Sequence, residues 1–291
     1  MIAFADRIAG APISWGVCEV PGWGYQLDPS LVLAQMRDVG LVATELGPEG
    51  FLPRDPQAAA STLRDAGLSA VGGFVPVVLH DAAHDPVPVV DAALDSLVAA
   101  GAGVVVLAAA TGLAGYDERP TLDEEAWERL LANLDRLAAR AASRGVVAVL
   151  HPHVGTLVER REDVDRVLAG SDVPLCLDTG HLLVGGTDPV ELVRSVPERV
   201  LHVHLKDVDA GWAAKVRDGD VSYTDAVAAG MYRPLGRGDV DVAQIVRLLE
   251  GRGYQGWYVL EQDTVLAGPP DGDGPLADVR DSVAYLRSLD D

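Results

Sequence analysis

Short apolar segments alternate with longer segments of helical periodicity along the whole chain. Eight of the short segments have the composition of β-strands, at residues 8–15, 41–46, 69–78, 104–109, 146–151, 174–177, 200–205 and 257–261. Near-continuous apolar strands indicate a parallel sheet covered on both sides, and eight is the number of strands that closes a barrel. The pattern therefore predicts a single (β/α)8 TIM-barrel domain over residues 1–291, in preference to a doubly wound open sheet.

The segments between these runs carry signals for helix starts. Asp28, Asp55 and Asp188 each stand directly before a proline, which pairs an N-cap oxygen with the residue favoured in the first helical turn. Thr121, followed by Glu124, predicts a capping box that opens a long helix. A doubly wound sheet would carry a glycine-rich phosphate turn after its first strand, and the sequence has no GxGxxG there. The helix signals therefore agree with a barrel.

Composition limits the classes of molecule that the protein is expected to bind and the compartment in which it is expected to function. The chain has 23 Lys and Arg against 44 Asp and Glu, a formal net charge of −21, which disfavours nucleic acid and anionic membranes as partners. Its first residues lack the basic segment and long apolar core of a signal peptide. Cys18 and Cys176 lie far apart and are expected to be free thiols. We therefore expect a cytoplasmic protein that binds a small molecule, and the sequence leaves open whether it forms a homo-oligomer.

One run places three polar residues at alternate positions among apolar ones. Residues 200–208 read VLHVHLKDV, so His202, His204 and Lys206 project from the same face of a strand. In a barrel, catalytic groups lie at the carboxyl ends of the strands. Ionisable residues also stand at the ends of other runs: Glu45, His151, His153, Asp178, His181, Glu261 and Asp263. This distribution predicts one site at one end of the barrel.

The same residues favour a metal site. Asp178, Glu261 and one or two neutral imidazoles form a mixed oxygen and nitrogen donor set, which suits Mn²⁺, Co²⁺, Fe²⁺ or Zn²⁺ better than Ca²⁺. The alternatives are a helix-capping role for Asp178 and a hydrogen-bonding role in the core for His202. Trp15 and Trp23 are either an aromatic wall for a sugar-like ring or part of the core.

A series of motifs resembles one known superfamily. In chain order the motifs read APISWGV, TELG, HPHVGT, LDTGH, HVHLKDV, PLGRGDVD and GWYVLEQD. Together they are similar to the xylose isomerase-like barrels, which include sugar isomerases, epimerases and relatives of endonuclease IV. Within that superfamily the set is most similar to the inosose (2-keto-myo-inositol) dehydratases. The resemblance covers essentially the whole chain and implies a barrel that acts on a polyol or sugar.

Carried over motif by motif, the resemblance implies a divalent metal held by His151, Asp178, His204 and Glu261. Lys206 matches the lysine of the HLKD motif. Relatives that epimerise carry glutamate where this chain has His151, which removes one of their two acid–base carboxylates. This departure favours a dehydratase and leaves a metal-dependent sugar isomerase or epimerase as the alternative.

The resemblance also implies residues that bind substrate. His181 matches a substrate-binding histidine, and Arg233 and Arg237 lie in a loop that closes over the substrate in relatives. We add Trp15, on the first loop, and Glu45, at a strand end, to this expected set.

The expected reaction is the dehydration of a cyclic polyol ketone through an enolate that the metal stabilises. Beside the cation, Lys206 is expected to have a lowered pKa and to act as the base or as a donor to the enolate. His153 or His181 would then protonate the departing hydroxyl. The favoured cofactor is Mn²⁺ or Co²⁺, with Zn²⁺, Fe²⁺ and Mg²⁺ as further options. A non-catalytic sugar-binding barrel and a DNA-repair nuclease are weaker alternatives, and the acidic composition argues against the nuclease.

Overall fold

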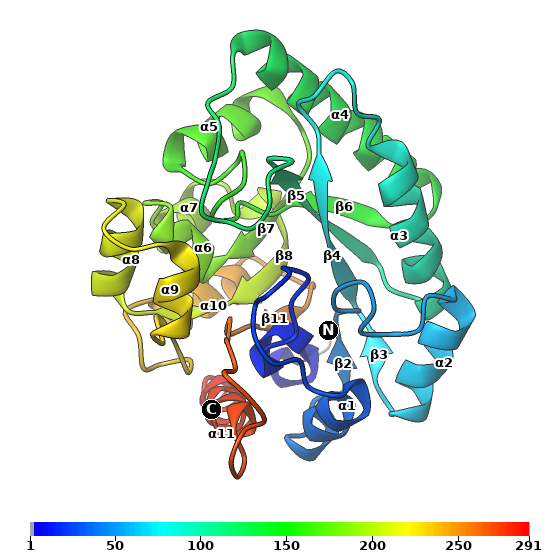
Figure 1. The fold of residues 1–291 in the computed structure, drawn as a ribbon, viewed down its shortest axis with the longest axis vertical. Coiled ribbons are helices and arrows are strands. Elements are labelled where there is room, and N and C mark those ends of the chain that lie inside the picture. Colours follow the sequence, from blue (N-terminus) through cyan, green and yellow to red (C-terminus); the bar gives the residue numbers. More distant parts are fainter. Residues whose placement is uncertain (1–2, 291) are drawn as a thin grey trace.

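Nine parallel strands form one sheet in the computed structural model, which describes residues 3–290 (Figure 1). Their bounds are β1 (Ile8–Gly10), β2 (Ala43–Thr44), β3 (Ser69–Ala70), β4 (Gly72–Val78), β5 (Val104–Ala110), β6 (Val147–Leu150), β7 (Leu175–Asp178), β8 (Val200–Leu205) and β11 (Tyr258–Leu260). The order across the sheet is β3-β2-β1-β11-β8-β7-β6-β5-β4. Its two ends, β3 and β4, are separated in the chain by Val71 alone, so they meet and the sheet curls into a nearly closed barrel. Together they form the run predicted at 69–78, and the predicted (β/α)8 barrel is confirmed.

Helices follow the strands in the chain and surround the sheet (Figure 1). Their bounds are α1 (Pro29–Asp38), α2 (Pro56–Asp65), α3 (Val87–Ala100), α4 (Glu124–Ser143), α5 (Arg161–Gly170), α6 (Thr179–Val184), α7 (Pro189–Ser195), α8 (Ala210–Arg217), α9 (Tyr223–Ala228), α10 (Val242–Gly251) and α11 (Pro275–Arg287). Three short 3-10 helices are η1 (Phe4–Arg7), η2 (Pro12–Trp15) and η3 (Pro197–Arg199). A separate antiparallel pair consists of β9 (Asp207–Val208) and β10 (Tyr232–Arg233). Within residues 3–290, every helix is too short or too polar to cross a membrane.

Three predicted helix starts are confirmed. The side chains of Asp28, Asp55 and Asp188 each accept a hydrogen bond at 2.8 Å from a backbone N–H in the first turn of α1, α2 and α7. In all three helices a proline occupies the first turn. Each cap satisfies a backbone donor that has no partner within its own helix.

Two predicted boundaries are wrong. The first strand ends at Gly10 rather than at residue 15, because Pro12 opens η2 and has no N–H to donate to a neighbouring strand. Helix α4 is capped by Asp123 rather than by Thr121, since the Asp123 side chain accepts a hydrogen bond from the Ala126 N–H at 2.9 Å. The carboxylate directly before the first turn therefore replaces the expected capping box.

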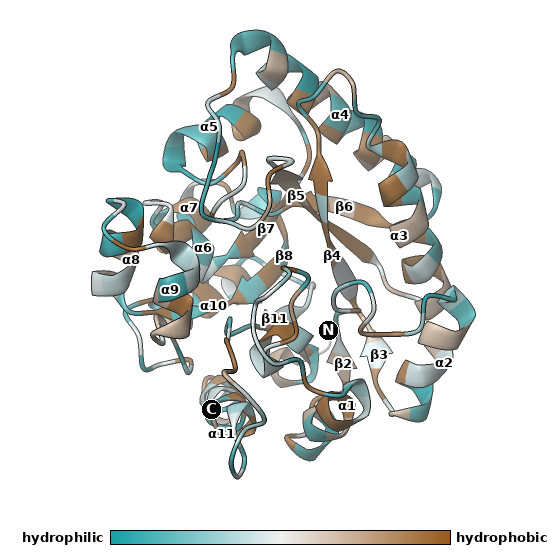
Figure 2. Ribbon diagram, viewed as in Figure 1, coloured by the Kyte–Doolittle hydropathy of each residue, from teal (hydrophilic) through white to brown (hydrophobic). Residues whose placement is uncertain are grey.

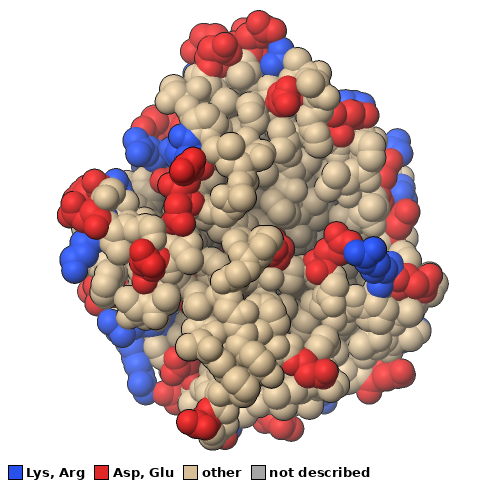
Figure 3. All heavy atoms as spheres, viewed as in Figure 1, with Lys and Arg blue, Asp and Glu red and all other residues tan. Residues whose placement is uncertain are grey.

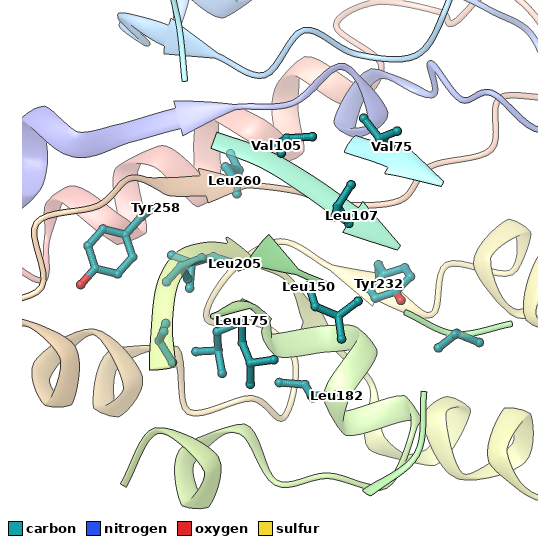
Figure 4. Packing of buried hydrophobic residues seen from close by; sticks show 14 of the residues in the cluster. Val75, Val105, Leu107, Leu150, Leu175, Leu182, Leu205, Tyr232, Tyr258 and Leu260 are labelled. Atoms are coloured by element: carbon teal, nitrogen blue, oxygen red, sulfur yellow. The ribbon is translucent and has the colours of Figure 1, made fainter. Parts of the chain in front are cut away.

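The main hydrophobic core joins the helices to the outer face of the strands. Figure 4 shows part of this packing, with labelled side chains from several strands: Val105, Leu107, Leu150, Leu175, Leu205 and Leu260. In Figure 2 the strands are mostly hydrophobic, whereas many helices are hydrophobic over only part of their length. Small apolar residues at strand positions form two further clusters, one of Val106, Val149 and Cys176 and one of Ala9, Ala11, Ala43, Val71 and Val259.

Strand β4 has one unpaired edge. It pairs with β5 from Gly72 to Val78. On its other side, among the backbone bonds of residues 3–290, the last one comes from the Leu46 N–H to the Gly72 carbonyl at 3.0 Å. Backbone groups alternate in direction along a strand, so Phe74 and Pro76 face the same side as Gly72. Pro76 has no N–H, and its place on this edge costs no sheet hydrogen bond.

Candidate metal centre and active site

The carboxyl ends of the strands bring most of the predicted site residues together. They come from β8 and from the ends of β2, β6, β7 and β11: Glu45, His151, His153, Asp178, His181, His202, His204, Lys206 and Glu261. All of these side chains are buried. Because parallel strands end at the same side of the barrel, residues far apart in the sequence form one polar layer there.

His204 lies between Glu45 on one side and the pair Asp178 and Glu261 on the other. Its Nδ1 atom is 3.2 Å from Glu261 Oε2 and 3.7 Å from Asp178 Oδ2. Its Nε2 atom is 3.0 Å from Glu45 Oε1, which also lies 2.8 Å from His202 Nε2. Burial alone would raise the pKa of Glu45, but these two histidines lower it to about 2. Glu45, expected to bind substrate, therefore holds His204 with Nδ1 directed at the other carboxylates.

The Asp178 side chain caps a helix and also contacts the other polar groups of the layer. Its Oδ1 atom accepts the His181 N–H at 2.8 Å and caps α6. Its Oδ2 atom lies 3.2 Å from His151 Nε2 and 3.3 Å from Lys206 Nζ. Each carboxylate oxygen has its own direction, so capping leaves the second oxygen free for the site.

Lys206 lies among three carboxylates. Its Nζ atom is 2.8 Å from Asp263 Oδ1, 3.0 Å from Glu261 Oε2 and 3.3 Å from Asp178 Oδ2. Burial alone would lower the pKa of Lys206, but Asp178, Asp263 and Glu261 outweigh it and hold that pKa well above its ordinary value. With the protein groups alone, the shift is opposite to the expected lowering. The carboxylates that would hold a cation act on the lysine as well.

Acidic groups outnumber fixed cations in this layer. Glu45, Asp178, Glu261 and Asp263 are buried carboxylates, and Lys206 is a buried ammonium in contact with three of them. His204 adds a second cation, because burial alone would lower its pKa but Cys176, Glu261 and Glu45 outweigh burial and hold that pKa well above the ordinary value. Four carboxylates still face two cations. A buried excess of negative charge is costly unless a cation balances it. The layer therefore favours a bound cation.

The donor atoms suit a metal ion. Those of Asp178, His204 and Glu261 lie within 4.8 Å of one another, and so do those of His151, Asp178 and His181. His204 Nδ1 is buried and lies 3.2 Å from Glu261 Oε2, but among the described residues it makes no hydrogen bond of ordinary geometry. Carboxylate oxygens and imidazole nitrogens in one cluster are typical ligands of divalent transition metals. These clusters can hold a metal ion.

A cavity of about 800 Å³ opens beside the polar layer. Its wall includes most of the predicted polar layer, namely Glu45, His151, His153, His204, Lys206 and Glu261, together with Asp263. Figure 3 shows a face hollowed near its centre, with most charged side chains around the rim. A small molecule in this cavity would contact the reactive groups directly.

Comparison with known families decides the classification. A family model described as xylose isomerase-like TIM barrel matches residues 33–289. The chain belongs to this family. The resemblance found in the motifs is therefore confirmed.

Relatives within the xylose isomerase-like family include named metabolic proteins. An inosose dehydratase of Geobacillus thermodenitrificans is 32% identical over 276 residues, which cover 90% of this chain and 92% of that protein. The rhizopine catabolism protein MocC of Rhizobium meliloti is 36% identical over 269 residues, which cover 88% of this chain and 81% of that protein. A crystal structure of the IOLI protein with a binding zinc atom has a TM-score of 0.69, covering 97% of this chain and 98% of that chain. At 14% identity this last likeness shows the fold alone.

The two tryptophans of the first loop have different positions in this member of the xylose isomerase-like family. Trp15, expected to bind substrate, is fully buried away from the cavity wall, and its Nε1–H donates to Gln35 Oε1 at 2.8 Å. Trp23 does lie on the cavity wall, with its Nε1–H donating to the Thr264 carbonyl at 3.0 Å. The core interpretation therefore holds for Trp15.

Two arginines expected near the substrate lie away from the cavity. Arg233 contacts Asp209 at 3.4 Å, and Arg237 contacts Asp281 at 2.5 Å. The Arg233 side chain is partly exposed and that of Arg237 largely exposed, and neither is part of the cavity wall. The structure gives them no contact with the polar layer.

The two histidines proposed as proton donors differ in their access to the cavity. His153 is part of the cavity wall, whereas His181 lies behind it, with its ring centroid 3.7 Å from that of His153. His181 Nε2 is 2.9 Å from Lys206 Nζ. Burial, followed by the neighbouring histidines and Lys206, holds the pKa of both imidazoles well below the ordinary value. His181 is thus positioned to support Lys206.

Two further residues of the cavity wall, Tyr116 and Tyr223, carried no prediction, whereas Asp263 was expected only as one of the ionisable strand-end residues. Tyr223 Oη donates to Asp263 Oδ2 at 2.5 Å, and the Tyr116 ring lies 4.5 Å from the ring of His153. Asp263 stands two residues after Glu261, so alternation places both carboxylates on the same side of the strand end. The tyrosines come from long connecting segments, where no local pattern indicates their position.

Proposed function

We propose that this chain is a divalent-metal-dependent dehydratase of a cyclic polyol ketone, and that inosose is its substrate. The observation that carries the proposal is the position of Lys206, held in the cavity wall among three carboxylates beside His204. An amine next to a cation site is the arrangement that proton removal beside a ketone requires. The inosose dehydratase relative covers most of the chain and supports this choice of substrate.

We assign the metal to His151, Asp178, His204 and Glu261. A divalent ion bound there would supply Lewis-acid polarisation of the ketone, which is worth several kcal/mol of charge stabilisation. Mn²⁺ or Co²⁺ fits the mixed donor set, and Zn²⁺, Fe²⁺ or Mg²⁺ are the alternatives. Glu45 would keep His204 in the orientation needed for binding.

Lys206 takes the proton from the carbon beside the ketone in this proposal. Its Nζ atom is fixed by Asp263 at 2.8 Å and by His181 at 2.9 Å, so its direction into the cavity is set before substrate arrives. Asp178 and Glu261, which raise its pKa, are two of the assigned metal ligands. A cation bound to these two carboxylates would offset their negative charge and lower the pKa of Lys206.

His153 is the better placed of the two histidines to protonate the departing hydroxyl. It lies on the cavity wall, and its Nδ1 atom is 2.7 Å from the Val154 carbonyl, which fixes the ring. Burial lowers the pKa of His153, so its imidazole is neutral at rest and must take up a proton before it can give one to the leaving hydroxyl. One C–H and one C–O bond break, a C=C bond forms, and the products are an unsaturated ketone and water.

The test is a direct assay of the purified protein. With Mn²⁺ or Co²⁺ added, inosose should give a product with the ultraviolet absorbance of an enone. No product from inosose, together with epimerisation of a ketose, would replace the lyase by the isomerase alternative. A protein that purifies without metal and takes up none when it is added would support the sugar-binding alternative instead.

A further inference from the structure

The cavity has a second part that the proposed reaction does not use. One side of its wall is the polar layer. The other side, here called the apolar arm, lies between the segment after β2, strand β4 and helix α3, and includes Leu46, Pro48, Leu52, Phe74, Pro76 and Val89. Glu49 and Arg54 also border it, but their largely exposed side chains pair with each other at 3.1 Å. The two parts are continuous, because all of these residues line one cavity.

The cavity is larger than an unsubstituted polyol ketone needs. Inosose has about twelve non-hydrogen atoms, and at no more than ~30 Å³ each, the volume share of a liquid water molecule, it fills at most about 360 Å³. The cavity measures about 800 Å³. More than half of it remains after a bare ring is seated at the polar layer.

Phe74 links the two parts of the cavity. Its ring lies 5.8 Å from the ring of His151 and 5.6 Å from that of His153. The Phe74 side chain is only partly buried, and it belongs to the segment of β4 whose edge is unpaired. A ring seated at the imidazoles therefore has an apolar wall directly beside it.

Helix α3 supplies the far wall of the apolar arm. Val89 is 44% exposed and lines the cavity, and Ala92, also on the cavity side, is small and exposed. Covering exposed apolar side chains around a concave space with an apolar group lowers the free energy, because it removes apolar surface from water. Within the same helix, Val98 is also 44% exposed but lies outside the cavity wall.

We propose that the apolar arm binds an apolar ether substituent on the polyol ring, so that the preferred ligand is an alkyl or aryl ether of the cyclic polyol ketone rather than the bare polyol. This proposal rests on the proposed function for the position of the ring. The ring itself contacts the polar layer, and the substituent extends past Phe74 toward α3.

Binding measurements test the apolar arm without requiring turnover. The probes are myo-inositol and its monobenzyl ethers, which lack the ketone and are not dehydrated, measured by calorimetry on the protein loaded with Mn²⁺. At least one ether should bind about tenfold more tightly than myo-inositol, because burial of its phenyl ring removes apolar surface from water. Equal affinities for myo-inositol and every ether would overturn the proposal.

Two matched valines on α3 locate the effect. Val89→Trp fills the apolar arm, so the advantage of the ether should fall below about twofold. Val98→Trp makes the same change on the same helix outside the cavity and should keep the advantage. An advantage that survives Val89→Trp, or that Val98→Trp removes equally, would contradict the assignment to the apolar arm.

The outcomes also separate this proposal from the proposed function. Inosose turnover is followed in parallel by the enone absorbance. No turnover with a retained ether advantage would remove the dehydratase and keep the apolar arm, whereas turnover without an ether advantage would do the reverse. If neither myo-inositol nor any ether binds, the proposal that the apolar arm binds an ether substituent is rejected.

Discussion

Each end of the barrel buries a cation in contact with carboxylate, and the two ends differ in how completely the charges are matched. At the amino end, Arg7 Nη2 contacts both oxygens of Glu250 at 2.7 and 2.6 Å. Arg7 Nη1 donates to the carbonyls of Tyr254 and Gly256 at 3.0 Å. At the carboxyl end, Lys206 contacts three carboxylates, and a fourth lies on the far side of His204.

The difference separates a structural ion pair from a reactive site. Arg7 meets one carboxylate and two carbonyls, so the charges balance and most of its donors have acceptors. Around Lys206 the four carboxylates exceed the two cations, Lys206 and His204, and among the described residues His204 Nδ1 contacts Glu261 without a hydrogen bond of ordinary geometry. A matched pair stabilises the fold, whereas an unmatched set has capacity left for a ligand.

Lys206→Met removes the amine at the carboxyl end and keeps the length of the side chain. We expect the kcat for inosose to fall by about 10³-fold, within the range for loss of an acid–base group. The enone absorbance measures the rate, and elemental analysis should find the same metal content as in the unaltered protein. Full activity would remove Lys206 from the reaction.

Arg7→Met is the same kind of change at the amino end, and it should leave the kcat unaltered. Its expected effect is a loss of about 2–3 kcal/mol in the free energy of unfolding, because two carbonyls lose a donor and Glu250 keeps only the hydroxyl of Tyr258. Urea unfolding followed by circular dichroism measures it. Glu250 is 33% exposed, so water can reach its carboxylate and limits the loss. A variant that loses activity but keeps its stability would break the contrast between the ends.

Metal binding should stabilise the protein through the carboxyl end alone. A divalent ion at 100 times its Kd adds about 2.7 kcal/mol to the free energy of unfolding. Glu261→Gln should abolish the rise in Tm that Mn²⁺ produces, and removal of the metal by a chelator should reverse that rise in the unaltered protein. Glu250→Gln, at the amino end, is the control and should keep the rise. Equal responses of the two variants would show that the ion binds elsewhere.

Glu45→Gln tests whether the contact behind His204 matters to the metal. We expect metal affinity to fall by about 10–100-fold, as for other residues that orient a ligand histidine. Calorimetric titration with Mn²⁺ gives the Kd, and excess metal should restore most of the kcat. A higher KM for inosose at unchanged metal affinity would show instead that Glu45 binds substrate, as its place at a strand end predicted.

Arg237→Ala should have the smallest effect. The Arg237 side chain is 64% exposed and pairs with Asp281, so its loss should change the free energy of unfolding by less than about 0.5 kcal/mol. The KM for inosose should stay within about twofold, since the side chain lies outside the cavity wall. A tenfold rise in KM would show that this loop reaches the substrate.

The fold and the polar layer were predictable because both follow from local periodicity. Alternation put His202 and His204 on one face, and in the structure both contact the same oxygen of Glu45. The barrel topology then required the strand ends to meet. These inferences depend on residue spacing within one segment and on one rule about parallel strands.

What could not be predicted depends on how distant segments approach one another. Trp15 and Trp23 lie on the same loop, yet only Trp23 is on the cavity wall. Tyr116 and Tyr223 meet His153 from separate long segments, with ring centroids 4.5 and 6.4 Å away. The pKa of Lys206 likewise depends on carboxylates from two other strand ends, so its direction required the folded arrangement.

The unpaired edge of β4 has a consequence for self-association. An exposed strand edge offers donors and acceptors on which a strand of another molecule can add, and this is a common route to aggregation. Pro76 stands in the middle of this edge, between Phe74 and Val78, and replaces a donor by a ring that fills the space. An incoming strand therefore finds an interrupted row of hydrogen-bonding groups. The edge beside the cavity is therefore a poorer template for strand addition than an uninterrupted edge would be.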